Sequence, residues 1–130
     1  EVQLPQLYLE AIELVRMFSL SGIASVGDDL VSQMKDLIRQ NLASRMELEE
    51  LFAEIPASYS KLRRLFRAST GISPGAYRIR CRIEKACDLL AEGQFQVSEI
   101  AYRLGYPNPF VFSAQFKQIT GQTPTYFGDL

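Results

Sequence analysis

Apolar residues recur at intervals of three and four along most of this 130-residue chain. That spacing is the period of an amphipathic helix, and the strict alternation of a β-strand is found nowhere. The pattern therefore predicts an all-α fold. The expected helices cover residues 6–20, about 28–42, 44–55, 58–70, 74–92, 97–104 and 108–120, followed by a short helical turn that begins at residue 123.

The residues between these segments predict where each helix begins and ends. Ser44, followed three residues later by Glu47, has the form of a capping box at a helix start. Ser58 begins the next helix, Gly71 ends it, and Ser73-Pro74 caps the long helix that follows. Helix, tight turn and helix occur in this order before residue 73 and again after residue 93, which predicts two helix-turn-helix units.

A motif over residues 66–74 recurs fifty residues later. The first copy is Phe66-Arg67, Thr70-Gly71 and Ser73-Pro74, and the second is Phe116-Lys117, Thr120-Gly121 and Thr123-Pro124. Two copies are too few for a solenoid, so they indicate a duplicated helical subdomain. We divide the chain into a linker or remnant helix of a preceding domain (1–27), a first helix-turn-helix subdomain (28–73), a connecting helix (74–92) and a second helix-turn-helix subdomain (93–130).

The helix over residues 58–70 separates its cations from its apolar side chains. At the angular step of an α-helix, Arg64 and Arg67 fall within about 40° of Ser60, and Arg63 lies about 60° away. The planar fork of arginine matches the O6 and N7 atoms of guanine in the major groove. Ser60, Arg63 and Arg64 are therefore candidates for base contacts, and a solvated helix face with no partner is the alternative.

The helix over residues 108–120 presents a different outer face. The positions equivalent to that cationic face are Pro109, Phe110, Ser113, Ala114 and Lys117. We expect Lys117 and the helix start near Asn108 to contact phosphate, whereas Phe110 and Ala114 suit thymine methyl groups. Little hydrogen-bonded base readout is expected from this helix, and a packing role for Phe110 is the alternative.

Charge is distributed unevenly along the chain. The net charge is −1, but residues 1–57 carry four cations and ten anions, whereas residues 58–85 carry eight cations and one anion. The remaining residues carry two cations and four anions. A basic zone of this kind, within an acidic chain, favours a phosphate-bearing partner.

The residue types present argue against an enzyme, a cofactor and a metal site. The chain contains no histidine, no phosphate-binding glycine loop and no ligand cluster, and its two cysteines have no histidine to activate them. Cys81 and Cys87 are six residues apart on one expected helix, a rise of about 9 Å, so we expect free thiols in the core. The apolar stretches are too short and too often charged to predict a membrane span.

Four blocks of residues carry a resemblance to a known family. They are Leu62-x-Arg64-x-Phe66-Arg67-x3-Gly71-x2-Pro74-x2-Tyr77, Arg82-Ile83-x2-Ala86-x2-Leu89-Leu90, Ile100-Ala101-x3-Gly105-Tyr106, and Phe112-Ser113-x2-Phe116-Lys117-x3-Gly121-x2-Pro124. Together they resemble the DNA-binding domain of AraC/XylS-type bacterial transcription activators. The likeness runs from Leu48 to Pro124, and about 100 residues are covered when the helix before it is included.

This resemblance implies residue roles and partners. It implies two recognition helices in successive major grooves of operator DNA. By matched position, Ser60, Arg63 and Arg64 face bases in the first unit, while Ser58, Lys61 and Arg67 face phosphates. In the second unit the base-reading places are held by Pro109, Phe110, Ser113 and Ala114. Arg82 is expected to be structural.

The chain departs from the family pattern at several places. Ala114 stands where an arginine is usual and Phe110 where a polar residue is usual, so we expect the first helix to dominate base readout. Phe52 and Pro56 replace a usual small residue and a usual glycine in the first unit, which is expected to alter the angle between its helices.

The resemblance and the chain's start also bear on the whole protein. Without an initiator methionine, the chain is expected to belong to a longer cytoplasmic, nucleoid-associated protein whose missing N-terminal domain senses a ligand or dimerises. RNA polymerase is a further expected partner. The alternative function is a helical interaction module that contacts RNA polymerase or another regulator, with weak or no specific DNA binding.

Overall fold

The computed structural model describes residues 26–128. In this part of the chain every regular element is a helix, which confirms the all-α prediction, and the expected helix over residues 6–20 lies outside it. The helices are α2 (Val26–Gln40), α3 (Leu48–Leu51), α4 (Tyr59–Thr70), α5 (Pro74–Glu92), α6 (Val97–Arg103), α7 (Pro109–Thr120) and α8 (Pro124–Gly128).

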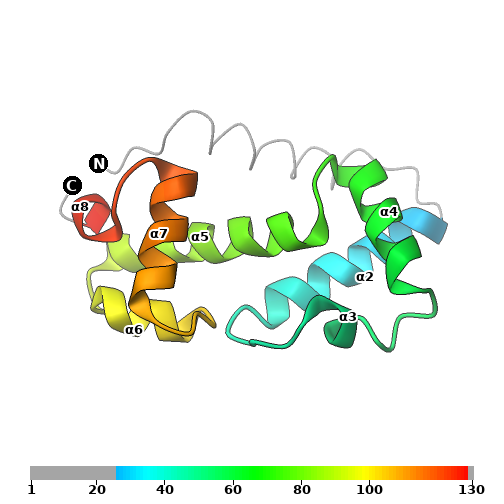
Figure 1. The fold of residues 1–130 in the computed structure, drawn as a ribbon, viewed down its shortest axis with the longest axis horizontal. Coiled ribbons are helices and arrows are strands. Elements are labelled where there is room, and N and C mark those ends of the chain that lie inside the picture. The colour runs from blue at the N-terminus through cyan, green and yellow to red at the C-terminus, as the bar shows by residue number, and fades with distance from the viewer. Residues whose placement is uncertain (1–25, 129–130) are drawn as a thin grey trace.

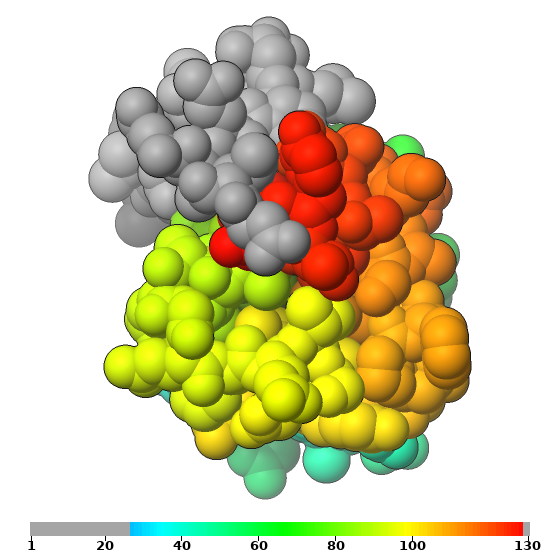
Figure 2. All heavy atoms as spheres, turned by 90° about the vertical axis from the view of Figure 1, so that its left-hand side faces the viewer, coloured from blue at the N-terminus to red at the C-terminus, as the bar shows by residue number. Residues whose placement is uncertain are grey.

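Two hydrophobic cores lie at opposite ends of α5, which contributes residues to both (Figure 1). The first core joins α2, α3 and α4 to the start of α5, where Tyr77 is buried. The second joins α6, α7 and α8 to the later turns of α5, where Ile83 and Ala86 are fully buried. Figure 2 shows α6, α7 and α8 packed side by side around that end of the molecule. The α5 helix is therefore the common support of both helical groups.

The helix ends follow the expected chemistry. The side chains of Ser58, Ser73 and Asn108 accept hydrogen bonds from backbone N–H groups three residues on, at 3.2, 3.1 and 3.0 Å. Gly71 and Gly121 then end α4 and α7 in the left-handed conformation, with φ of 82° and 83°. Because a side chain disfavours positive φ, glycine is the natural residue at both ends.

The sequence repeat is also a structural repeat, and it extends over residues 58–77 and 108–127. The hydroxyl of Thr70 donates to the carbonyls of Phe66 (2.8 Å) and Ile72 (3.0 Å). Thr120 makes the same pair of hydrogen bonds, at 2.9 and 3.0 Å. Each threonine therefore ties the end of its helix, α4 or α7, to the turn that follows it.

An aromatic pair completes each copy of the repeat. Phe66 packs edge-on against Tyr77 with ring centroids 5.3 Å apart, and Phe116 packs in the same way against Phe127 at 5.4 Å. All four rings are almost fully buried. Edge-to-face pairs at this distance contribute about 0.5–1.5 kcal/mol beyond their burial, so the same packing unit anchors both recognition helices.

The prediction for residues 44–55 is wrong in two respects. Ser44 does not cap a helix, because its hydroxyl accepts from the Met46 N–H at 3.1 Å and α3 begins only after Glu47. The helix also ends at Leu51 rather than near residue 55. The chain continues through a turn before Pro56, and the residue that precedes a proline disfavours the helical conformation, so the helix could not have continued past Ile55.

Candidate nucleic-acid interface

The outer face of α4 carries four solvent-exposed polar side chains. Ser60, Arg63, Arg64 and Arg67 are all exposed, while Phe66 on the other side of the helix has no exposed surface. We call these four residues the α4 recognition face. Their exposure fits the angular spacing in the sequence, since the inner stripe of α4 anchors the helix and leaves the guanidinium groups outside.

An aromatic ring that sequence reasoning missed orients one of these arginines. The Arg63 guanidinium lies over the Tyr59 ring, 5.6 Å from its centroid. Tyr59 in turn packs against the buried Phe52 ring at 6.3 Å. An aromatic residue four positions before an arginine on a helix was the available signal, because such pairs lie on the same face.

The α4 recognition face borders a depression of about 330 Å³. Its lining includes Arg63, Arg64 and Arg67 of α4, the first residues of α5, Pro74 and Gly75, and Ser73, which caps α5. A helix start carries partial positive charge, so both sides of this depression favour an anion. At the start of α4, Lys61 is exposed, and its N–H donates to the hydroxyl oxygen of Ser58.

The outer face of α7 has different chemistry. Pro109, Phe110, Ser113, Ala114 and Lys117 form what we call the α7 recognition face, and Phe110 is 85% exposed. That exposure excludes a packing role for the Phe110 ring within residues 26–128. Pro109 and Ser113 are half-buried, whereas Ala114 and Lys117 are exposed.

Arg82 joins the two helical groups across the middle of the molecule. Its Nε donates to the Leu42 carbonyl at 3.0 Å and its Nη2 donates to the Ser44 carbonyl at 2.6 Å. The same guanidinium lies 5.5 Å from the centroid of the Tyr106 ring. These contacts confirm the structural role expected for Arg82, because they link α5, the loop after α2 and the turn before α7.

The turn at Gly105 and Tyr106 completes this junction. Arg45 Nη2 donates to the Tyr106 carbonyl at 3.2 Å, and the Tyr106 hydroxyl donates to Gln115 Oε1 on α7. Burial raises the pKa of Tyr106 to about 12, so its hydroxyl keeps the proton that it donates even in alkaline solution where an exposed tyrosine ionises. The junction therefore connects the first helical group directly to the second recognition helix.

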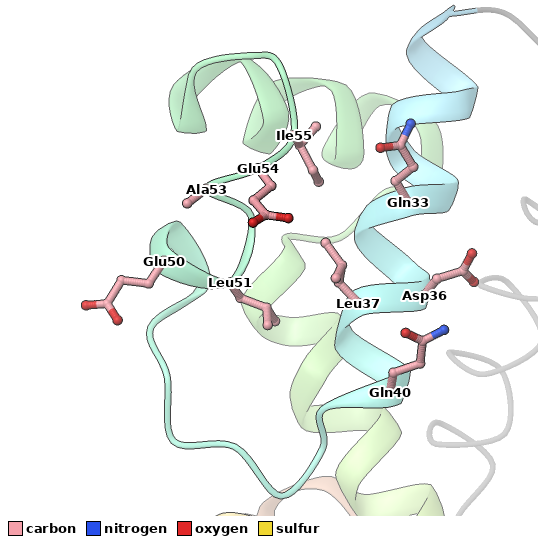
Figure 3. A pocket seen from close by; sticks show the side chains of 9 residues that line it. All are labelled: Gln33, Asp36, Leu37, Gln40, Glu50, Leu51, Ala53, Glu54 and Ile55. Atoms are coloured by element: carbon pink, nitrogen blue, oxygen red, sulfur yellow. The ribbon is translucent and has the colours of Figure 1, made fainter.

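A larger hollow between α2 and the α3 turn is unsuited to DNA. It has a volume of about 540 Å³, and Figure 3 shows the side chains that line it. Three of these, Asp36, Glu50 and Glu54, are acidic. Carboxylates repel phosphate, so the cationic face of α4 is the better candidate for a nucleic-acid interface.

Two helix-turn-helix units on one central helix, each with its own outward recognition helix, define a bipartite DNA-binding domain. Comparisons with known proteins agree with this class. A family model described as "Helix-turn-helix domain" matches residues 51–129. The chain belongs to the AraC/XylS-type helix-turn-helix family of transcription regulators, which is not a family of enzymes.

Two curated relatives illustrate the similarity in sequence. The transcriptional activator RhaS of Klebsiella pneumoniae is 30% identical over 112 residues, which are 86% of this chain and 40% of that protein. The Msm operon regulatory protein of Streptococcus mutans is 26% identical over 125 residues, 94% of this chain and 45% of that protein. The chain thus spans less than half the length of these relatives.

Two solved structures show the same fold. The C-terminal domain of AraT, a response regulator from Geobacillus stearothermophilus, aligns with a TM-score of 0.76 and 27% identity over 81% of this chain and 88% of that one. The DNA-binding domain of AdpA, solved in complex with a target DNA, aligns with a TM-score of 0.71 and 25% identity over 76% of this chain and 89% of that one. None of the helices described in the present structure has the length and apolar character needed to cross a membrane.

Proposed function

We propose that this chain binds a specific double-stranded DNA site of about two helical turns, with α4 and α7 in successive major grooves. Figure 1 shows these helices at opposite ends of α5. The α5 helix has 19 residues, a length of about 28 Å, which is comparable to one turn of B-DNA at about 34 Å. The length of the connecting helix thus suits two adjacent grooves on one side of the duplex.

The α4 recognition face is the observation that carries the proposal. Three exposed guanidinium groups lie beside a helix start, so Ser60, Arg63 and Arg64 would contact bases while Arg67 would hold the backbone. Arginine gives bidentate readout of guanine, so α4 would dominate sequence specificity.

The remaining proposed contacts place the domain on the phosphate backbone. We assign phosphate contacts to Ser58, Lys61, Asn108 and Lys117, and base contacts to Phe110 and Ser113. Ser58 and Asn108 use an oxygen to cap their own helices. A hydroxyl hydrogen and an amide NH2 group remain able to donate to a phosphate oxygen.

The proposal extends to the whole protein. Because the curated relatives are more than twice as long, we propose that a further N-terminal domain senses a ligand or dimerises. We also propose that the regulator acts in the bacterial cytoplasm on operator DNA, with RNA polymerase as its partner at the promoter.

Selection from random-sequence duplexes at two salt concentrations tests the DNA proposal. We expect enrichment of an asymmetric site with one sharply defined half and one loosely defined half. Affinity should fall with a log–log salt slope of roughly −0.9 for each phosphate contacted. Failure to enrich any sequence, together with weak and salt-insensitive binding, would contradict the proposal.

The acidic hollow between α2 and α3 favours the alternative function, a protein-interaction module. Asp36, Glu50 and Glu54 surround the half-buried Leu37 and Leu51, which would suit a basic segment with apolar side chains. The same salt titration separates the two functions, because a module that does not bind DNA specifically gives no enriched site.

An arginine introduced into α7 should strengthen general DNA binding. Ala114 is exposed and corresponds by the repeat to Arg64 of α4. We expect Ala114→Arg to raise affinity for operator and unrelated duplexes alike, and to steepen the salt dependence by about one phosphate contact. Fluorescence anisotropy at several salt concentrations measures both, with Ala114→Gln as the neutral control. Unchanged affinity would indicate that α7 does not reach the duplex.

A further inference from the structure

The two recognition helices have the same framework but opposite surface chemistry. Residues 58–77 and 108–127 share their caps, their threonine hydrogen bonds and their aromatic pairs. Within this framework the recognition face changes from Ser60 and Arg64 on α4 to Phe110 and Ala114 on α7. The change is confined to the outside, so packing of the domain does not account for it.

The α7 recognition face nevertheless keeps a cation where α4 has one. Lys117 occupies the place of Arg67, seven residues after Phe110 and on the same side of the helix. Phe110, Ala114 and Lys117 thus form one stripe, apolar at the amino end and basic farther along. In a helix docked in the major groove, the amino end approaches the base edges and a cation farther along suits the backbone.

The major groove offers one prominent apolar group to such a stripe. The C5 methyl of thymine is the largest apolar group displayed on the major-groove edge of the base pairs, where cytosine presents only a C5–H. A phenylalanine ring cannot form hydrogen bonds with the polar groups of the base edges. The Phe110 ring, which is 85% exposed, would bury its apolar surface most favourably against thymine methyls.

The size of the apolar area distinguishes DNA from a protein partner. The exposed apolar surface of this stripe consists of the Phe110 ring and the methyl group of Ala114, and the adjacent Val111 is 44% exposed. A stable protein interface buries about 800 Å² on each side, whereas a phenylalanine buries about 150–250 Å². A single ring matches one or two base edges better than it matches a protein surface.

We propose that the half-site under α7 contains thymines and is recognised through their C5 methyl groups, by Phe110 with Ala114 beside it. This inference rests on the proposed DNA-binding function. It makes the two halves of the operator chemically different: hydrogen-bonded guanine under α4 and methyl-bearing thymine under α7.

Replacing thymine by deoxyuridine tests the inference, because it removes the methyl group and preserves base pairing. Each thymine of the α7 half-site in the selected operator is replaced singly, and affinity is measured by anisotropy. We expect about a fourfold loss for each contacted methyl, the value for one buried CH2-sized group. Unchanged affinity at every position of that half-site would overturn the inference.

Protein variants test whether the Phe110 side chain causes the difference in affinity between thymine and deoxyuridine. With Phe110→Ala most of the difference between thymine and deoxyuridine should disappear in the α7 half-site, while Phe110→Leu should retain more of it. Sensitivity to base changes under α4 should be the same in both variants. An equal loss of affinity on the thymine and deoxyuridine duplexes would contradict a methyl contact.

Two other results would separate this inference from the proposed function. If Phe110→Ala leaves DNA affinity unchanged and lowers transcription, the ring contacts a protein and the inference is wrong. If no specific site is enriched and Arg64→Ala has no effect, the proposed function itself fails. A specific site that depends on Arg64 but not on thymine methyls would overturn this inference alone.

Discussion

Replacing Arg64 by alanine is expected to weaken binding to the selected operator by about 1–3 kcal/mol, the range for one bidentate arginine–guanine pair. Arg64 is exposed on α4 and lines the cationic depression. The loss should be concentrated at one base pair, so that the variant tolerates substitutions at that position. Thermal stability should be unchanged, because the side chain lies outside the hydrophobic cores.

Two matched variants separate base readout from charge. Arg67→Ala should weaken binding to all sequences alike and reduce the salt slope by about one contact. Lys85→Ala removes an exposed cation from α5, outside both recognition helices, and should have a smaller effect. Binding titrations on the operator and its single-base variants measure all three. If Arg64→Ala binds every duplex as the wild type does, Arg64 does not contact a base.

Replacing Gly105 by alanine is expected to destabilise the domain by roughly 2–5 kcal/mol and to weaken operator binding as well. Gly105 has φ of +81°, where a side chain is strained. A Cβ atom there would lie 2.9 Å from Arg82 Nη2 and 3.0 Å from the carbonyl oxygens of Leu42 and Ala43. It would therefore disturb the Arg82 junction that relates the two helical groups.

Gly71→Ala is the matched control for this prediction. Gly71 has nearly the same φ, +82°, but nothing lies within 4 Å of its hypothetical Cβ. Its replacement should therefore cost the backbone strain alone, about 1–2 kcal/mol. Chemical denaturation of both variants gives the two free energies of unfolding. Equal destabilisation would mean that the contacts around Gly105 add nothing beyond its backbone conformation.

The repeat explains why so much of the fold could be predicted from the sequence. Caps such as Ser73-Pro74 and stops such as Gly71 act through their own local backbone. The second copy of the repeat has the same capping and terminating residues, so the helix ends predicted in one copy support those predicted in the other. The exposed face of α4 could be predicted in the same way, because a fixed turn per residue converts spacing into direction.

The prediction failed where contacts distant in sequence compete with local signals. Residues 44–47 have the local form of a helix start, but the Ser44 hydroxyl accepts from the Met46 N–H and its carbonyl accepts from Arg82, 38 residues away. The role of Tyr59 could be predicted only in part. Its contact with Arg63 follows from their spacing on one helix, but its packing against the Phe52 ring depends on the tertiary fold. The hydrogen bond from Arg45 to the Tyr106 carbonyl joins residues 61 positions apart, and no local sequence pattern predicts it.

Local signals in the sequence were enough to predict the helical class, the duplication, the ends of most helices and the exposed side chains of α4. These properties follow from the period of the helix and from short-range capping. The tertiary structure alone decided how the two halves are held together, through Arg82, Arg45 and the Gly105 turn. Such contacts join backbone carbonyls to distant side chains, and every residue has a carbonyl, so residue type does not reveal which one is used.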